Sequence, residues 1–265
     1  LYSELNRIFA DFEVNVAYTG ADEFVTCQAL HNSTSFRLDG LKVADGLQMS
    51  QNPYGSIWYR MYVVIRNCNI FLENVDHTYN MSEEDRNWWK ADVKAVKAFI
   101  YFELVRRYGP ICLIPQNMPV DLPVKDYQLP RQHVDSCFKE IINLLDESME
   151  YVPKRSQKIS NYDHTFCLEA VYALKAKVLL YLFNGNAFYS DFKNKNGELL
   201  FNSTYDRNKW LLAAEAADKA AEICEEGGRA LVSGATGKKT DLLNKMADIE
   251  NMSFSRFNNS EYLLE

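Results

Sequence analysis

Polar and aromatic side chains gather in residues 24–56, a segment without helical periodicity that contains two Asp-Gly turn signals and one Asn-Pro turn signal. A segment of this length inside a compact domain is typically a functional loop or a surface excursion. Carboxylates and amides form hydrogen bonds to polar ligands and an aromatic ring offers a face for stacking, so this segment is the best candidate in the chain for a ligand-facing loop. We predict ligand contact for four residues, each of which also fits an ordinary loop position: Asp45, Gln48, Asn52 and Tyr54.

The sequence offers no arrangement of side chains for catalysis. No Ser/His/Asp, Cys/His or paired-carboxylate set stands out. The four histidines do not pair with cysteines or carboxylates at a metal-ligand spacing. Residues 234–240 (GATGKKT) resemble a phosphate-binding loop, but the first glycine of that motif is missing and Lys238 is followed by lysine. We therefore predict a protein that is not an enzyme and holds no metal and no cofactor.

Charge and composition exclude two classes of partner. The formal charge of −7 over 265 residues argues against nucleic acid, because phosphate binding needs a basic surface. No apolar run approaches the roughly 18 residues of a membrane-spanning helix.

The six cysteines are scattered without a C-x-x-C pair, so we do not expect a disulfide framework. Four of them fall inside predicted helices and are interpreted as small buried hydrophobic residues: Cys68, Cys137, Cys167 and Cys224.

Helical periodicity accounts for most of the remaining chain. Apolar residues recur at helical spacing in seven segments: residues 2–18, 57–76, 82–108, 131–150, 163–186, 207–226 and 240–249. Several of these have alanine-rich faces that suit close packing of antiparallel pairs, and a single pair cannot bury its apolar face alone. The predicted fold is therefore all-α, a tetratricopeptide-like helical-repeat array with long loops, forming one domain over residues 1–265.

The helix predicted at 82–108 has the clearest ends. Ser82 caps the first turn, with Asp85 placed to reach back to it. Gly109 stands where a left-handed cap would end the helix. Three lysines lie together opposite the apolar face and are predicted to be solvated: Lys90, Lys94 and Lys97.

Two other helices carry predictions about their faces. Asn69 lies on the apolar face of the helix at 57–76, and we interpret it as a structural residue that ties adjacent helices, in preference to a ligand contact. In the helix at 207–226, the predicted packing face consists of Trp210, Ala213, Ala214, Ala217 and Ala221.

Motifs at six places, in order along the chain, resemble those of the SusD/RagB family. Around the helix at 82–108, the residues that fit are Ala98, Tyr101, Phe102, Leu104, Tyr108, Gly109 and Leu113. In the helix at 57–76 they are Trp58, Tyr62, Ile65, Asn69 and Leu72. Lys97 stands where the family usually has arginine, and Cys112 where it usually has proline. Each motif is loose, but their joint order is specific.

The resemblance implies that this chain is the N-terminal portion of a SusD-like protein of the outer membrane, exposed at the cell surface. It implies a non-enzymatic protein that binds a glycan or other nutrient and delivers it to a SusC-like TonB-dependent transporter. Membrane attachment would be only through a lipid anchor on a cysteine before Leu1. A second function stays open, a helical-repeat scaffold that binds a protein or peptide. An upstream lipidation cysteine would favour the first.

Overall fold

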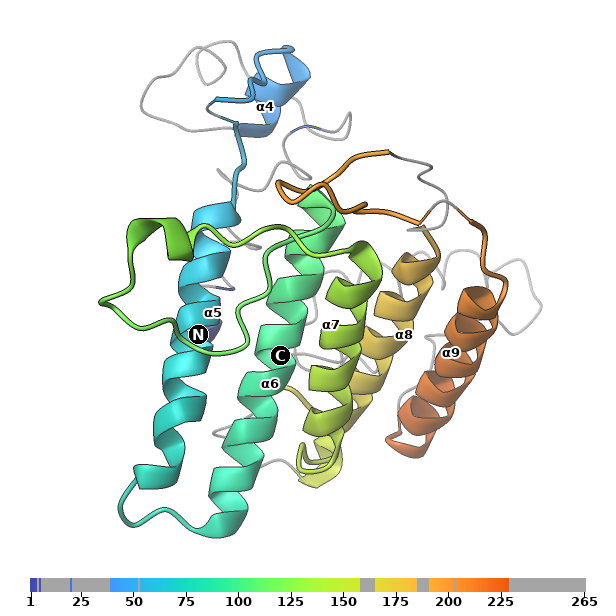
Figure 1. Cartoon of the computed structure of the whole chain (residues 1–265). Helices are drawn as coiled ribbons and strands as arrows, with labels where there is room; N and C mark the ends of the chain where they lie inside the picture. The colour runs from blue at the N-terminus through green and yellow to red at the C-terminus, as the bar shows by residue number, and fades with distance from the viewer. Residues whose placement is uncertain are drawn as a thin grey trace, which may run out of the picture. The chain divides into compact units, whose positions relative to one another are not determined.

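A computed structural model describes residues 1–3, 5, 20, 39–51, 53–157, 165–184, 191–202 and 204–228 (Figure 1). The chain divides into two compact units, residues 1–69 and 70–265, which are described separately. The boundary falls within α5 (Trp58–Asn74). The helix predicted at 240–249 lies outside the described residues, as does most of the one predicted at 2–18.

The first unit contains a short helix where the sequence predicted an irregular segment. α4 (Asp39–Ala44) spans six residues, too few for an apolar periodicity to be recognised. Gly46 follows it with a φ of 74°. The N–H of Leu47 donates to the carbonyl of Lys42 at 3.0 Å, and the N–H of Gly46 donates to that of Val43 at 3.0 Å. This is a Schellman cap, which a glycine with positive φ makes possible. The sequence prediction is therefore wrong at α4.

The second unit is a row of antiparallel helices. It begins with the end of α5 and η1 (Val75–His77), followed by α6 (Glu83–Tyr108), α7 (Val134–Met149), α8 (Leu168–Asn184) and α9 (Asn208–Glu226). From α6 onward, each helix packs against the next and runs in the opposite direction (Figure 1). Within the described ranges the only extended pairing is one isolated bridge, between Lys193 and Leu199. The prediction of an all-α helical-repeat array is confirmed.

α6 has the ends that the sequence predicted. The hydroxyl of Ser82 accepts a hydrogen bond from the N–H of Asp85 at 3.0 Å and donates one to the Asp85 carboxylate at 2.6 Å. The carboxylate thus bonds to the capping hydroxyl, and not to the backbone N–H of Ser82 as in a full capping box. At the other end, α6 stops at the predicted glycine, and the N–H of Gly109 donates to the carbonyl of Val105 at 2.9 Å. The predicted left-handed helical cap is wrong in its conformation, because Gly109 combines a φ of 69° with a ψ of −147°.

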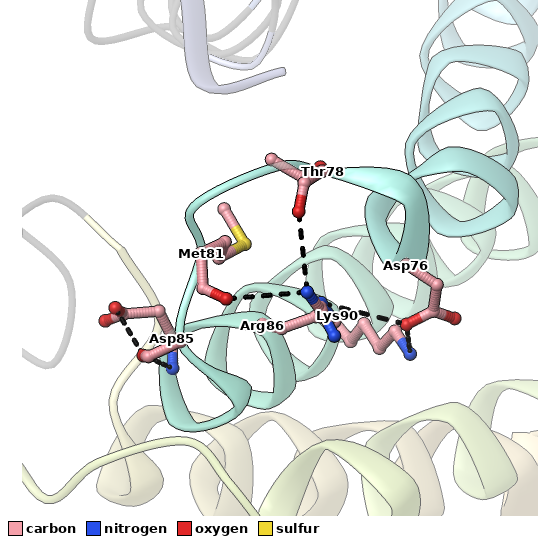
Figure 2. Close-up of polar contacts among 7 residues, drawn as sticks. Asp76, Thr78, Met81, Asp85, Arg86 and Lys90 are labelled. Atoms are coloured by element: carbon pink, nitrogen blue, oxygen red, sulfur yellow. Dashed lines mark hydrogen bonds and ion pairs between the residues drawn. The ribbon is translucent and has the colours of Figure 1, made fainter.

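Two cations fix the turn that leads into α6 (Figure 2). Asp76 of η1 accepts from the ammonium of Lys90 at 2.5 Å and lies 4.0 Å from Nε of Arg86. Arg86 also donates to the carbonyls of Thr78 and Met81, at 3.5 and 3.4 Å. The hydrogen bond from Lys90 is the main reason that the pKa of the Asp76 carboxyl is lowered. These contacts set the path of the chain from η1 into α6.

The lysine row of α6 does not form the solvated face that the sequence predicted. Lys94 is half-buried and pairs with Glu147 of α7 at 2.7 Å. Lys97 is only 2% exposed, and its ammonium donates to the carbonyl of Pro115 at 2.9 Å. Neighbouring segments supply an acceptor for each lysine, and a buried ammonium with an acceptor avoids the cost of an unpaired charge.

The packing face of α9 also differs from the prediction. Of the five predicted residues, Ala213 is buried, whereas the other four are exposed: Trp210, Ala214, Ala217 and Ala221. The buried face instead contains Lys209, Ala213 and Ala220. Lys209 turns inward because its ammonium binds Asp135 of α7 at 2.7 Å. Three of the four exposed residues are alanines, which gain little from burial.

The prediction of buried cysteines is confirmed for Cys68, Cys137 and Cys167, which are buried, and is wrong for Cys224, which is half-buried. Cys112 is also half-buried, and none of these five described cysteines forms a disulfide. Asn69 is buried as expected, at 1% exposure. None of the described helices is both long and apolar enough to cross a membrane.

Candidate ligand-binding loop

The candidate loop consists of residues 39–56, which run from α4 to the start of α5 and are described except for Asn52. Asp45, Gln48 and Tyr54, three of the four predicted ligand contacts, therefore have a defined position. The fourth, Asn52, lies outside the described residues.

Gln48 and Tyr54 are brought together, but through the backbone of the tyrosine. The amide oxygen of Gln48 accepts from the N–H of Tyr54 at 2.7 Å, and its amide nitrogen donates to the Tyr54 carbonyl at 3.3 Å. The side-chain amide of Gln48 thereby bonds to both backbone groups of Tyr54, as the backbone of a neighbouring β-strand would. Gln48 thus acts first as a clamp that positions Tyr54.

Asp39 is a second clamp, which was not among the predicted contacts. It is fully buried, and its carboxylate accepts from the N–H of Gly55 at 2.6 Å. Gly55 has a φ of 65°, a conformation that favours glycine. The Asp39-Gly40 pair indicated a turn in the sequence, but no sequence signal links Asp39 to a glycine sixteen residues further on.

The surface that these clamps present combines acidic, apolar and aromatic groups. Asp45 is exposed, Leu47 and Met49 are 47% and 50% exposed, and Tyr54 is half-buried. A carboxylate accepts hydrogen bonds from hydroxyl groups, and a partly exposed ring offers a face for stacking. The described residues contain no cluster of side chains suited to a metal ion. The arrangement offers groups that can bind a neutral polar ligand.

Solved structures with the same fold extend well beyond the length of this chain. The protein BT4246 superposes with a TM-score of 0.78 at 23% identity, over 96% of this chain and 46% of its own. A SusD-like protein from Bacteroides fragilis gives a TM-score of 0.61 at 20% identity, over 88% and 38%. A laminarin-binding SusD-like protein gives 0.55 at 19% identity, over 100% and 50%. The chain thus spans half or less of the length of each of these proteins.

Sequence comparison identifies the family directly. No curated protein matches the chain by sequence. A family model described as SusD-like, starch-binding and associating with the outer membrane matches residues 8–180, which is more than half of the chain. That match begins before the candidate loop and ends within α8. The chain belongs to the SusD-like family, as the order of its sequence motifs predicted.

Proposed function

We propose that this chain is part of a protein that captures glycans at the outer membrane and delivers them to a TonB-dependent transporter. The family match over residues 8–180 carries the proposal, because that family is described as starch-binding and associated with the outer membrane. Solved structures of this fold include a laminarin-binding protein and one with a xylogluco-oligosaccharide. The protein acts by binding, without catalysis, and is attached to the outer surface by a lipid.

Within the chain, we assign ligand contact to the candidate loop. Its shape is fixed before a ligand arrives, because Gln48 and Asp39 hold the backbone at Tyr54 and Gly55. A preformed loop loses little conformational entropy on binding, which raises affinity. Asp45 accepts hydrogen bonds from the sugar hydroxyls, and the ring of Tyr54 stacks on a sugar face.

Calorimetric titration with a panel of soluble oligosaccharides tests this assignment. Both the full-length protein and this chain are titrated, as wild type and as the Tyr54→Ala and Asp45→Ala variants. We expect Tyr54→Ala to weaken binding about tenfold or more, because it removes the stacking face but leaves the Gln48 bonds to the backbone in place. Tyr79→Ala is the matched control, since Tyr79 is a tyrosine 89% exposed in the turn before α6.

Three outcomes separate the parts of the proposal. Equal affinity of the wild type and both loop variants would move the site away from the candidate loop. Binding by the full-length protein alone would place the decisive contacts outside this chain. If neither form binds any glycan, the glycan-capture function is wrong, and a scaffold that binds a protein or peptide becomes the better explanation.

A further inference from the structure

Arg60, in the first turn of α5, has a guanidinium group that lacks a hydrogen-bond partner at one nitrogen. Its Nη1 atom is buried from solvent and makes no hydrogen bond within the described part of the chain. A buried donor without an acceptor destabilises a protein, because water no longer replaces the missing partner. Such donors are rare in native structures, and an absent ligand is one physical reason for them.

Arg86 provides the comparison, as a second half-buried arginine with one such nitrogen. Its Nε has no hydrogen-bond partner among the described residues, but the same guanidinium donates to the carbonyls of Thr78 and Met81 and lies 4.0 Å from Asp76 (Figure 2). Within the described ranges, Arg60 forms neither a hydrogen bond nor an ion pair. The charge of Arg60 is therefore available to a ligand.

The turn that carries Arg60 is fixed and reaches solvent. Ile57, immediately before α5, is only 1% exposed. The rings of Trp58 and Tyr62 pack against each other, with their centroids 4.9 Å apart. Tyr59, next to Arg60, is 79% exposed, so this turn is open to the solution. The helix thus sets the position of Arg60, while its long side chain can still turn toward a ligand.

This turn directly follows the candidate loop, and both belong to the first unit. The Cα atoms of Tyr54 and Arg60 lie no more than about 18 Å apart, because the chain between them ends in helical residues. Gln48 and Asp39 hold the backbone just before this turn, at Tyr54 and Gly55. One oligosaccharide chain can therefore contact the loop and Arg60 together.

We propose that the glycan captured at this loop is acidic, and that a carboxylate of a uronic acid unit binds the guanidinium of Arg60. This inference rests on the proposed function, which supplies the glycan, and it names the class of sugar. A carboxylate presents two oxygens in one plane, which match two donors of a guanidinium. The half-buried position of Arg60 strengthens the pair, because the attraction between charges is screened less there than in bulk water.

The unpartnered nitrogen makes a carboxylate a better ligand than a hydroxyl. When the side chain turns to a carboxylate, two of its donors gain charged acceptors, so binding relieves an unfavourable state of the free protein. Asp45, earlier in the loop, is exposed and repels the same carboxylate. It accepts from the hydroxyls of a neutral unit, which orients the glycan with its acidic unit toward α5.

Calorimetric titration of the full-length protein with acidic oligosaccharides tests the inference. The probes are oligogalacturonates and oligosaccharides that contain glucuronic acid. Each is compared with its carboxyl-reduced form, a neutral chain of the same length and linkage. We expect at least one acidic probe to bind about tenfold or more tightly than its reduced form. Arg60→Gln should lower the affinity for that acidic probe to near the affinity for the reduced form.

Arg66→Gln is the matched control, because Arg66 is an exposed arginine on the same helix and its replacement removes the same charge. This variant should keep the preference for the acidic probe. A preference that is lost equally in both variants would reflect only the net charge of the protein, and it would overturn the assignment to Arg60.

Thermal unfolding tests the unpartnered donor separately from binding. Arg60→Leu replaces the guanidinium by an apolar side chain, and its thermal midpoint without ligand should equal or exceed that of wild type. The acidic probe at saturation should raise the midpoint of wild type more than that of the variant. A lower midpoint of the free variant would show that Arg60 serves the fold, which overturns the inference.

The failure of this inference differs from the failure of the proposed function. If the full-length protein binds glycans but never prefers an acidic probe to its reduced form, the acidic class is wrong while glycan capture stands. A preference that persists in Arg60→Gln would also overturn the role of Arg60. If the full-length protein binds no glycan, acidic or neutral, both conclusions are wrong.

Discussion

At the scale of single residues, Glu73 holds the connector loop, residues 115–130 between α6 and α7, through its hydrogen bonds to Asn117. The hydrogen bonds from the backbone and side chain of Asn117 lower the pKa of the Glu73 carboxyl, with a smaller contribution from the charge of Lys97. These bonds favour the ionised carboxylate, because protonation turns one of its two accepting oxygens into a donor and weakens it as an acceptor. The anchor at Asn117 therefore weakens when Glu73 is protonated.

This coupling predicts how the stability of the protein depends on pH. A carboxyl whose pKa is lower in the folded state stabilises the fold above its unfolded pKa, and the contribution is lost as the pH falls through the folded pKa. We therefore expect Glu73→Gln to be less stable than wild type near neutral pH. The difference should disappear as the pH falls below the ordinary glutamate pKa of 4.5. Urea denaturation of both proteins across this pH range measures it.

Glu215→Gln is the control, because Glu215 is an exposed glutamate in the middle of α9. Its stability relative to wild type should change little across the same pH range. A constant difference between wild type and Glu73→Gln at every pH would show that the ionisation of Glu73 does not hold Asn117.

The sequence could predict that Lys97 lies on a helix, but not that its ammonium is buried. Its spacing from Lys90 and Lys94 indicated one face of a helix, and that placement is right. Its acceptor is a carbonyl at Pro115, in a proline-rich connector without periodicity. No local rule places such a connector against a particular helix, so burial of the ammonium could not be foreseen.

At the scale of elements, the end of α6 depends on Gly109. Its φ of 69° and ψ of −147° fall in a region that is essentially restricted to glycine. A Cβ atom there would lie 3.3 Å from the ring of Phe201, which packs over this end of the helix. The close approach of an aromatic ring therefore adds to the backbone requirement.

Replacement of Gly109 should lower the free energy of unfolding more than replacement of a glycine that is needed only for its positive φ. Gly197 has a φ of 82°, and a Cβ there would meet nothing within 4 Å. We expect Gly197→Ala to cost about 1 kcal/mol of unfolding free energy. Gly109→Ala should cost about 2–3 kcal/mol, because steric contact is added. Chemical denaturation of both variants measures the difference, and equal losses would mean that the Phe201 contact is unimportant.

Elements with explicit end signals were predictable, and the candidate loop was predictable only in part. Ser82 and Gly109 define α6 in the sequence and in the structure. α4 is too short to show a helical periodicity, and in the sequence its Schellman cap appears only as a turn signal at Gly46. Gln48 was chosen for its planar amide, and that amide serves the backbone of Tyr54. Side-chain to backbone pairing across six residues has no sequence signature.

At the scale of the whole molecule, a buried thiol reports on cooperative opening of the second unit. Cys137 lies on the buried face of α7, and burial raises the pKa of its thiol to about 11. At pH 8 only about one thiol in a thousand would be ionised, and only the thiolate reacts with alkylating reagents. Reaction therefore requires exposure of the helix to solvent.

Alkylation kinetics should consequently follow unfolding. We expect Cys137 to stay unmodified by iodoacetamide at pH 8 under conditions in which glutathione reacts completely. Its modification should increase with urea in parallel with the loss of helical circular dichroism. Mass spectrometry of peptides gives the extent at each concentration. Modification of Cys137 at the same rate with and without urea would show that α7 opens locally.

The helical-repeat architecture was predictable because helical periodicity and ordered motifs recur along the whole chain. The rotation of each helix about its own axis, which decides the face that is buried, was not predictable. α9 shows the difference: its existence and its ends follow from the sequence, but its buried face does not. That face carries Lys209, whose ammonium binds Asp135, a residue 74 positions earlier in the chain. Charged pairs between distant segments leave no periodic trace.

The two clamps of the candidate loop have a consequence for how recognition can diversify. Gln48 and Asp39 hold the loop by bonding to backbone atoms of Tyr54 and Gly55, and the side chain of Tyr54 takes no part in those bonds. The side chains at four exposed positions take no part in either clamp: Leu47, Met49, Ser50 and Gln51. On the proposed assignment of ligand contact to this loop, substitutions there change what the surface recognises while both clamps persist. New specificities can thus arise at these positions, by natural variation or in a combinatorial library, while the loop keeps its conformation.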